Sequence, residues 1–136
     1  MKRIVLIVMV FVTSLQLSAQ DKVEVNKNPN APVISYESNV IEYGEIARGS
    51  DGVRYFNFTN AGKEPLIISN VRSSCGCTIP EYPRTPIGPN QESQIKIKYD
   101  TKRVGPFRKT ITIYSNVEGK AVTVTIKGRV LSESKK

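Results

Sequence analysis

The stretch Ser93-Gln94-Ile95-Lys96-Ile97-Lys98-Tyr99-Asp100 decides the fold class of this 136-residue chain. Within it, an apolar Ile or Tyr occupies every second position, and Gln or Lys fills the positions between. Successive side chains of a β-strand point to opposite faces, so this alternation predicts a strand with one buried face and one face in water. The stretch therefore indicates a sheet that packs on one side against a core.

The same pattern recurs on both sides of this stretch. Residues 109–115 and 121–130 alternate in the same way, and shorter β-rich runs occupy 33–36, 40–43, 53–59 and 66–71. Turn residues separate the runs, as in Asn60-Ala61-Gly62-Lys63, where glycine is free to take a positive φ. The spacing predicts an all-β, immunoglobulin-like two-sheet sandwich of about seven to eight antiparallel strands.

The first residues follow the order of a secretory signal peptide. Met1-Lys2-Arg3 is cationic, 4–12 is apolar, and Ser18-Ala19-Gln20 ends the segment with small and polar residues. The apolar run is shorter than the roughly 20 residues that a spanning helix needs. We expect cleavage after residue 19 and an extracytoplasmic location, periplasmic by default, with no transmembrane segment left. The expected divisions are a signal peptide at 1–19, a flexible leader at 20–32, the sandwich at 33–131 and a disordered tail at 132–136.

The composition argues against an enzyme. The chain has no histidine, so a serine or cysteine nucleophile would lack its usual base. Its acidic residues are scattered without an obvious acid–base pair, and no glycine-rich phosphate loop is present. We therefore expect a non-enzymatic protein that uses no cofactor. Nucleic acid is not an expected partner, because no aromatic residues interleave with the basic ones as a stacking platform.

The only two cysteines lie in Ser74-Cys75-Gly76-Cys77-Thr78. In an extended strand their Cα atoms would be about 6.6 Å apart, whereas disulfides prefer about 5.5–6 Å. A Cys75–Cys77 bond therefore requires a bend, which Gly76 permits most readily. Three interpretations stay open: a structural thiol pair or disulfide, a strained redox couple, and a soft-metal site holding Cu(I) or shared by a dimer. Two thiolates without histidine do not complete a zinc site, and no metal site is assigned.

Six basic residues gather on one expected strand, the turn after it and the next strand. They are Lys96, Lys98, Lys102, Arg103, Arg108 and Lys109. Lys96 and Lys98 share an outward face, so a basic patch that attracts anionic glycans, lipid headgroups or an acidic partner is a candidate. The alternative is a solvated face whose lysines discourage edge-to-edge sheet pairing.

Several short motifs occur in the order of one bacterial family. They are Ile41-Glu42-Tyr43-Gly44-Glu45-Ile46 with Gly49, Phe56-Asn57-Phe58-Thr59-Asn60-Ala61-Gly62, Pro65-Leu66, Ser74-Cys75-Gly76-Cys77-Thr78, Tyr99-Asp100-Thr101, Gly105-Pro106-Phe107 and Ser115-Asn116. Over about residues 33–130 the chain resembles an exported, Bacteroidetes-type domain family of unknown function with an SCGCT signature. That family is similar to Hydin-like and major-sperm-protein-like immunoglobulin-type domains. The resemblance implies the sandwich fold and an extracytoplasmic setting, and it implies no catalytic residues.

The sequence therefore leaves two hypotheses for the function. The first is an exported, non-enzymatic immunoglobulin-like module that binds an unknown protein or glycan partner or has a structural role. The second is a periplasmic thiol-redox or Cu(I)-handling protein that acts through Cys75 and Cys77.

Overall fold

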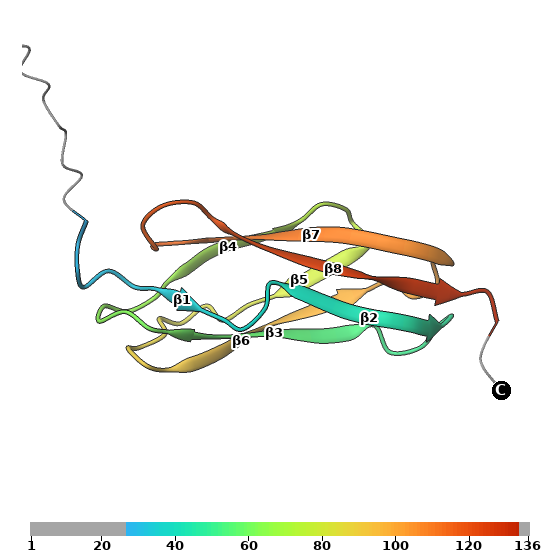
Figure 1. Ribbon diagram of the computed structural model, residues 1–136, viewed down its shortest axis with the longest axis horizontal. Coiled ribbons are helices and arrows are strands. Elements are labelled where there is room, and N and C mark those ends of the chain that lie inside the picture. The colour runs from blue at the N-terminus through green and yellow to red at the C-terminus, as the bar shows by residue number, and fades with distance from the viewer. Residues whose placement is uncertain (1–26, 134–136) are drawn as a thin grey trace, which may run out of the picture.

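The computed structural model describes residues 27–133, which form two four-stranded sheets packed face to face (Figure 1). The strand order is β1-β3-β6-β5 in the first sheet and β2-β8-β7-β4 in the second. The strands are β1 (Ile34–Ser35), β2 (Val40–Ala47), β3 (Val53–Asn60), β4 (Ile68–Ser73), β5 (Thr78–Glu81), β6 (Glu92–Tyr99), β7 (Gly105–Ser115) and β8 (Val122–Leu131). The predicted all-β immunoglobulin-like sandwich is confirmed.

Parts of the chain lie outside this description. The signal peptide expected at 1–19 and the first part of the leader belong to them, as do the last three residues. Within the described residues, no helix is long and apolar enough to cross a membrane.

The strand pairing departs from the expectation at one place. Every pair is antiparallel except β2 with β8, which run parallel. The departure arises because the chain leaves the first sheet after Ser35 and joins the second at Val40. As a result, β1 covers only the last two residues of β3, pairing Ile34 with Asn60 and Ser35 with Thr59.

The alternating positions of the sequence fill the space between the sheets. Ile95 and Ile97 are fully buried, and Tyr99 is nearly so. The ring of Tyr99 stacks on Phe107 with centroids 3.9 Å apart, and the edge of Tyr43 meets Phe107 at 5.3 Å. Burial of aromatic and branched side chains is the main contribution to stability in a domain of this size.

A glycine makes room for this aromatic cluster. A Cβ added to Gly128 on β8 would lie 2.7 Å from the Cβ of Tyr43 and 3.1 Å from the ring of Phe107. The close approach of β2 to β8 therefore requires glycine at this position.

Strand β5 was not expected from the sequence. Pro80 lies within it, and proline normally argues against a strand unless the strand is at a sheet edge. β5 is such an edge, because it pairs only with β6. Asp100 N donates to Cys77 O (2.9 Å), so the backbone groups of Cys77 face β6. Backbone groups alternate in direction along a strand, so those of Pro80, three residues later, face away from β6. The missing N–H of Pro80 therefore breaks no hydrogen bond between the two strands.

Asn60, which the sequence places in a turn, is the fully buried last residue of β3. Its Oδ1 accepts hydrogen bonds from the backbone N–H groups of Val33 (3.3 Å) and Gly62 (3.0 Å). Its Nδ2 donates to the carbonyl oxygens of Glu64 (2.9 Å) and Ile87 (3.0 Å). One amide thus fixes the start of β1, the turn after β3 and the segment before β6.

Candidate functional site: a groove beside a free strand edge

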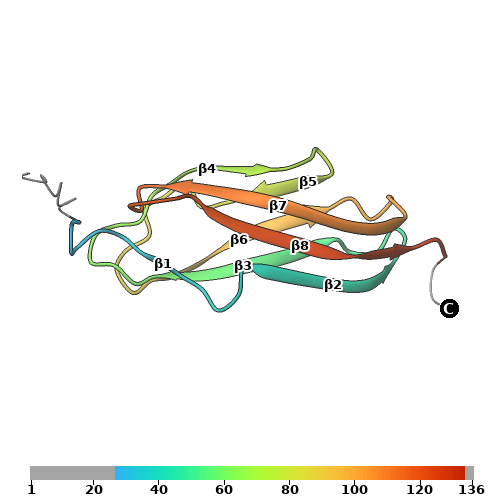
Figure 2. The same ribbon diagram turned by 45° about the horizontal axis from the view of Figure 1, so that its top comes forward.

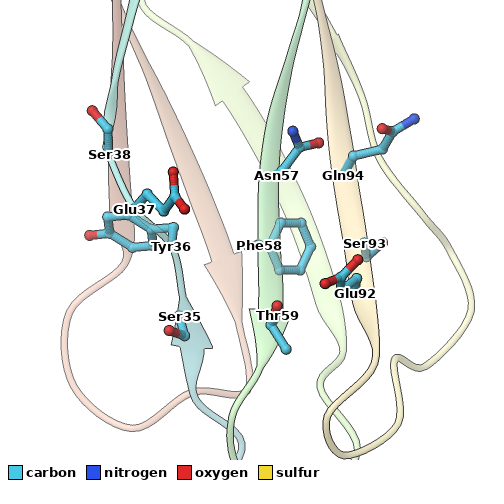
Figure 3. Close-up of a pocket in the computed structure, with 10 residues that line it drawn as sticks. All are labelled: Ser35, Tyr36, Glu37, Ser38, Asn57, Phe58, Thr59, Glu92, Ser93 and Gln94. Atoms are coloured by element: carbon cyan, nitrogen blue, oxygen red, sulfur yellow. The ribbon is translucent and has the colours of Figure 1, made fainter.

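An open groove of about 810 Å³ lies where the chain leaves β1 and diverges from β3 (Figure 3). Three segments line it. They contribute Ser35, Tyr36, Glu37 and Ser38 from the first, Asn57, Phe58 and Thr59 from β3, and Glu92, Ser93 and Gln94 from β6. Figure 3 shows the first segment on one side of the gap and the two strands on the other. The switch of the chain from one sheet to the other therefore creates the groove.

The groove joins an aromatic ring to polar groups. Tyr36 is 39% exposed, and its ring packs on the buried Phe56 with centroids 5.3 Å apart. Phe58 is buried, whereas the carboxylates of Glu37 and Glu92 are exposed to solvent. No Lys or Arg lines the groove, although the chain carries 20 of them and a net charge of +8. The groove is therefore an acidic place on a basic protein.

Hydrogen bonds at the end of β3 define which backbone groups point to the groove side. Asn60 N donates to Gln91 O (3.1 Å) on the β6 side, while Ala61 N donates to Val33 O (2.8 Å) on the β1 side. Backbone groups of successive residues in an antiparallel strand alternate between its two neighbours. The odd-numbered residues of β3 therefore direct their N–H and C=O groups away from β6.

Beyond Ser35 these odd-numbered groups have no strand beside them. Val53 is satisfied locally, since its N–H donates to Asp51 Oδ1 (2.9 Å) and its carbonyl accepts from Arg54 (2.7 Å). For Tyr55 and Asn57, no backbone partner on that side exists among residues 27–133. Both residues are exposed, so β3 presents a free edge that begins at the groove.

Two other sheet edges are interrupted or flanked by other groups. Pro80 leaves β5 without a donor on its open side, as described above. Ahead of β4, Leu66 and Ile87 exchange two backbone hydrogen bonds (2.8 and 2.9 Å), and the hydroxyl of Tyr82 donates to Ser69 O at 3.5 Å. Covering or interrupting an edge is the usual protection against strand addition, and the edge of β3 lacks it at Tyr55 and Asn57.

The two cysteines form a disulfide in the tight turn that carries the chain from β4 to β5, and thus from one sheet to the other (Figure 2). Their Cα atoms are 5.3 Å apart, so the chain bends as expected. The bend does not depend on Gly76, which has no positive φ and would leave an added Cβ free of contacts. Cys77 is buried in the core and Cys75 is half-buried.

Hydrogen bonds hold the disulfide turn to both sheets. Ser74 N donates to Thr110 O (2.8 Å) on β7, and Asp100 N donates to Cys77 O (2.9 Å) next to β6. Cys77 N also donates to Cys75 Sγ (3.3 Å). The geometry fits a local clamp at the crossover, and among the described residues no group of three or more Cys, Asp or Glu could hold a metal ion.

The structure divides the six basic residues between the two sheets. Lys96 and Lys98 lie on the outer face of the first sheet, and Lys96 pairs with Glu81 at 3.4 Å. Arg108 points outward from β7 in the second sheet, and Lys109 is half-buried on the same side of β7 as the inward-facing Phe107. The remaining pair, Lys102 and Arg103, follows β6 in an exposed turn, where Arg103 meets Asp100 at 3.7 Å. The six residues therefore do not gather on one face.

Two buried tyrosines have shifted acidities. Desolvation raises the pKa of Tyr43 to about 12, and its hydroxyl donates to Gly52 O at 2.9 Å. Burial also raises the pKa of Tyr99. Both groups belong to the aromatic cluster of the core and neither lines the groove.

The family model described as "Protein of unknown function (DUF1573)" matches residues 34–130. The chain belongs to the DUF1573 family. The expected membership of a family of unknown function is confirmed at this level. Among curated proteins, no sequence matches the chain.

Solved structures share the fold. A protein of unknown function from Porphyromonas gingivalis W83 superimposes with a TM-score of 0.65 at 17% identity, over 75% of this chain and 49% of that one. The chain thus spans about half the length of the Porphyromonas protein. PapD-like domain 7 of human CEP192 has a TM-score of 0.65 at 8% identity, over 79% of this chain and 91% of that one. VesB protease of Vibrio cholerae matches over 32% of its chain, with a TM-score of 0.53 at 11% identity and 73% of this chain covered. Identities this low show a common immunoglobulin-type fold and nothing about activity.

The sequence did not reveal the groove, because its residues come from three separate segments. One local signal was available. The β-rich runs 33–36 and 40–43 are interrupted by Glu37-Ser38-Asn39, and such a break marks the point at which a strand can change sheets.

Proposed function

We propose that this protein is an exported, non-enzymatic binding module that holds a protein partner at the groove beside β3. The observation that carries the proposal is the groove itself, which joins hydroxyl, amide and carboxylate groups to an exposed tyrosine ring next to a free strand edge. These polar side chains lie outside the core, so they are available to a ligand. A concave surface with a few convergent polar groups is the usual form of a binding site.

Photo-cross-linking in cells that produce the protein tests this proposal. Asn57 borders the groove and is exposed, so replacing it with benzoylphenylalanine should give one discrete cross-linked product after irradiation. Thr110 is the matched control, because it is also an exposed strand residue but lies on β7 of the second sheet. Equal products from both positions, or none from Asn57, would contradict the proposal.

Export is part of the proposal and has its own measurement. The cationic start, apolar run and small residues at 1–19 support processing by a signal peptidase. The intact mass of protein recovered from the extracytoplasmic fraction should correspond to a chain that begins at Gln20. Recovery of the full-length chain from the cytoplasm would contradict export.

The second candidate function is thiol exchange or soft-metal binding at Cys75 and Cys77. One observation favours it: the bond lies in a surface turn where Gly76 is exposed and Cys75 is only half-buried. Intact mass after alkylation without reductant should show a two-proton deficit and no label if the bond is closed. A Cys75→Ser/Cys77→Ser protein that folds and still gives the Asn57 cross-link supports the binding module, whereas loss of the cross-link with the fold intact supports the second function.

A further inference from the structure

Resting on the proposed function, we propose that the groove accepts an extended, basic peptide segment that adds to the first sheet as a strand beside β3. The segment would continue the line of β1, antiparallel to β3, and carry Lys or Arg on its outward side.

The open side of β3 has backbone groups that a further strand can bond. Tyr55 and Asn57 each direct an N–H and a C=O to the open side of β3, on the line along which Ser35 already pairs with Thr59. A strand on that line would form the same kind of backbone hydrogen bonds with Tyr55 and Asn57 that β1 forms with Thr59. Strand addition of this kind gives affinity through the backbone and specificity through alternate side chains.

The side chains determine which face of the added strand is apolar. Thr59 and Ser35, which form a hydrogen-bonded pair on this line, are not core residues, whereas Phe56 and Phe58 point inward. Residues of the added strand that bond to Tyr55 and Asn57 therefore point outward, and those between them point toward the core. The exposed ring of Tyr36, which already packs on Phe56, offers an apolar contact to the inward residues.

The charge of the site determines the outward residues. Glu37 and Glu92 flank the groove and no cation lines it. Lys96, which lies opposite Tyr55 on β6, pairs with Glu81, and Arg54 lies 4.5 Å from the centroid of the Tyr43 ring. An acidic pair at the mouth of the groove complements Lys or Arg on the outward face of a strand.

Two capped peptides test the inference on protein produced from the full sequence. The probes are Lys-Val-Lys-Val-Lys-Val-Lys and Glu-Val-Glu-Val-Glu-Val-Glu. The net charge of +8 attracts the acidic peptide non-specifically, so preference for the basic one requires a local site. We expect the basic peptide to bind at least tenfold more tightly. At saturation it should slow amide hydrogen exchange at Tyr55 and Asn57 at least tenfold, with Phe58 unchanged because its amide already bonds to β6.

Modified peptides and proteins provide matched controls. N-methylation at the lysines, whose amides face β3, should reduce affinity at least tenfold, whereas N-methylation at the valines should not. Glu37→Gln with Glu92→Gln should reduce the basic preference below threefold, whereas Glu45→Gln on β2 should leave it unchanged. Asn57→Pro should abolish binding, and the methylated peptides answer the same question if that protein does not fold.

Several results would overturn the inference. They are equal or tighter binding of the acidic peptide, absence of binding by the basic one, and unchanged exchange at Tyr55 and Asn57. Protection at Tyr55 and Asn57 that rises with protein concentration without peptide would instead identify a second copy as the occupant. A specific Asn57 cross-link in cells combined with no binding of the basic peptide would retain the proposed function and reject strand addition.

Discussion

Replacing Asn60 with alanine should destabilise the protein by about 4 kcal/mol. The side chain is fully buried and makes four hydrogen bonds to backbone groups of four different residues. A typical intramolecular hydrogen bond contributes about 1 kcal/mol net, and a buried group left without its partner costs about 1–3 kcal/mol. Of the four backbone groups, Ile87 O keeps a second donor in Leu66 N and is not left without a partner. We therefore use the lower figure of about 1 kcal/mol for each of the four bonds, which gives about 4 kcal/mol.

Urea unfolding of the wild-type and variant proteins measures this loss. Asn57→Ala is the matched control, because it removes the same amide from the exposed face of the same strand and should cost within about 0.5 kcal/mol. Asn60→Asp should be at least as destabilising as Asn60→Ala, because a carboxylate faces the carbonyls of Glu64 and Ile87 where the amide donated.

The same experiment can refute the reasoning. A loss below about 1.5 kcal/mol for Asn60→Ala, or a loss equal to that of Asn57→Ala, would mean that water replaces the amide at this site. Because typical domains are stable by about 5–15 kcal/mol, the expected loss is large enough to measure without ambiguity.

Three further predictions concern the core and the turns. Tyr43→Phe should cost about 0.5–1 kcal/mol at neutral pH. Because the pKa of Tyr43 is raised from 10.0 to about 12, the contribution of its hydroxyl to stability is complete below pH 10 and is lost as pH rises toward 12. Between pH 10 and 12 the Tyr43→Phe protein should therefore lose less stability than the wild type. Parallel pH profiles of the two proteins would contradict this. Gly62→Ala should be strongly destabilising in urea melts, since its Cβ would lie 2.2 Å from a backbone oxygen, whereas Gly76→Ala should be nearly neutral; equal effects would contradict the packing argument. Reduction of Cys75–Cys77 should lower stability by about 1.5 kcal/mol or less, because the bond closes a very short loop, and a larger loss would make it a principal support of the fold.

Local alternation was sufficient to predict the sandwich. Ile95, Ile97 and Tyr99 alternate with polar residues, and all three are buried between the sheets as that period requires. The same reasoning failed for β5, because Thr78-Ile79-Pro80-Glu81 is short and contains a proline, and its strand geometry comes from pairing with β6. The alternation of apolar and polar residues in β6 does not show which other segment pairs with β6.

The site depended on tertiary arrangement to a greater extent. Proximity in sequence suggested that Lys98 and Arg108 share a surface, yet β6 and β7 belong to different sheets. Asparagine is common in turns, so the sequence placed Asn60 in one. It is buried because three segments of the folded chain meet around its side-chain amide. The groove has the same origin, since Glu37 and Glu92 line opposite sides of the gap that forms where the chain after β1 diverges from β3.

The parallel pairing of β2 and β8 also determines how the domain responds to mechanical force. The chain enters beside β1 at one end of the sandwich and leaves after β8 at the other (Figure 1). A pull between these ends draws β2 and β8 past each other along their length, so the hydrogen bonds between Val40–Ala47 and β8 are sheared together and do not unzip one at a time. The strand switch that opens the groove therefore also places the parallel pair of β2 and β8 in line with a pull on the two ends of the domain.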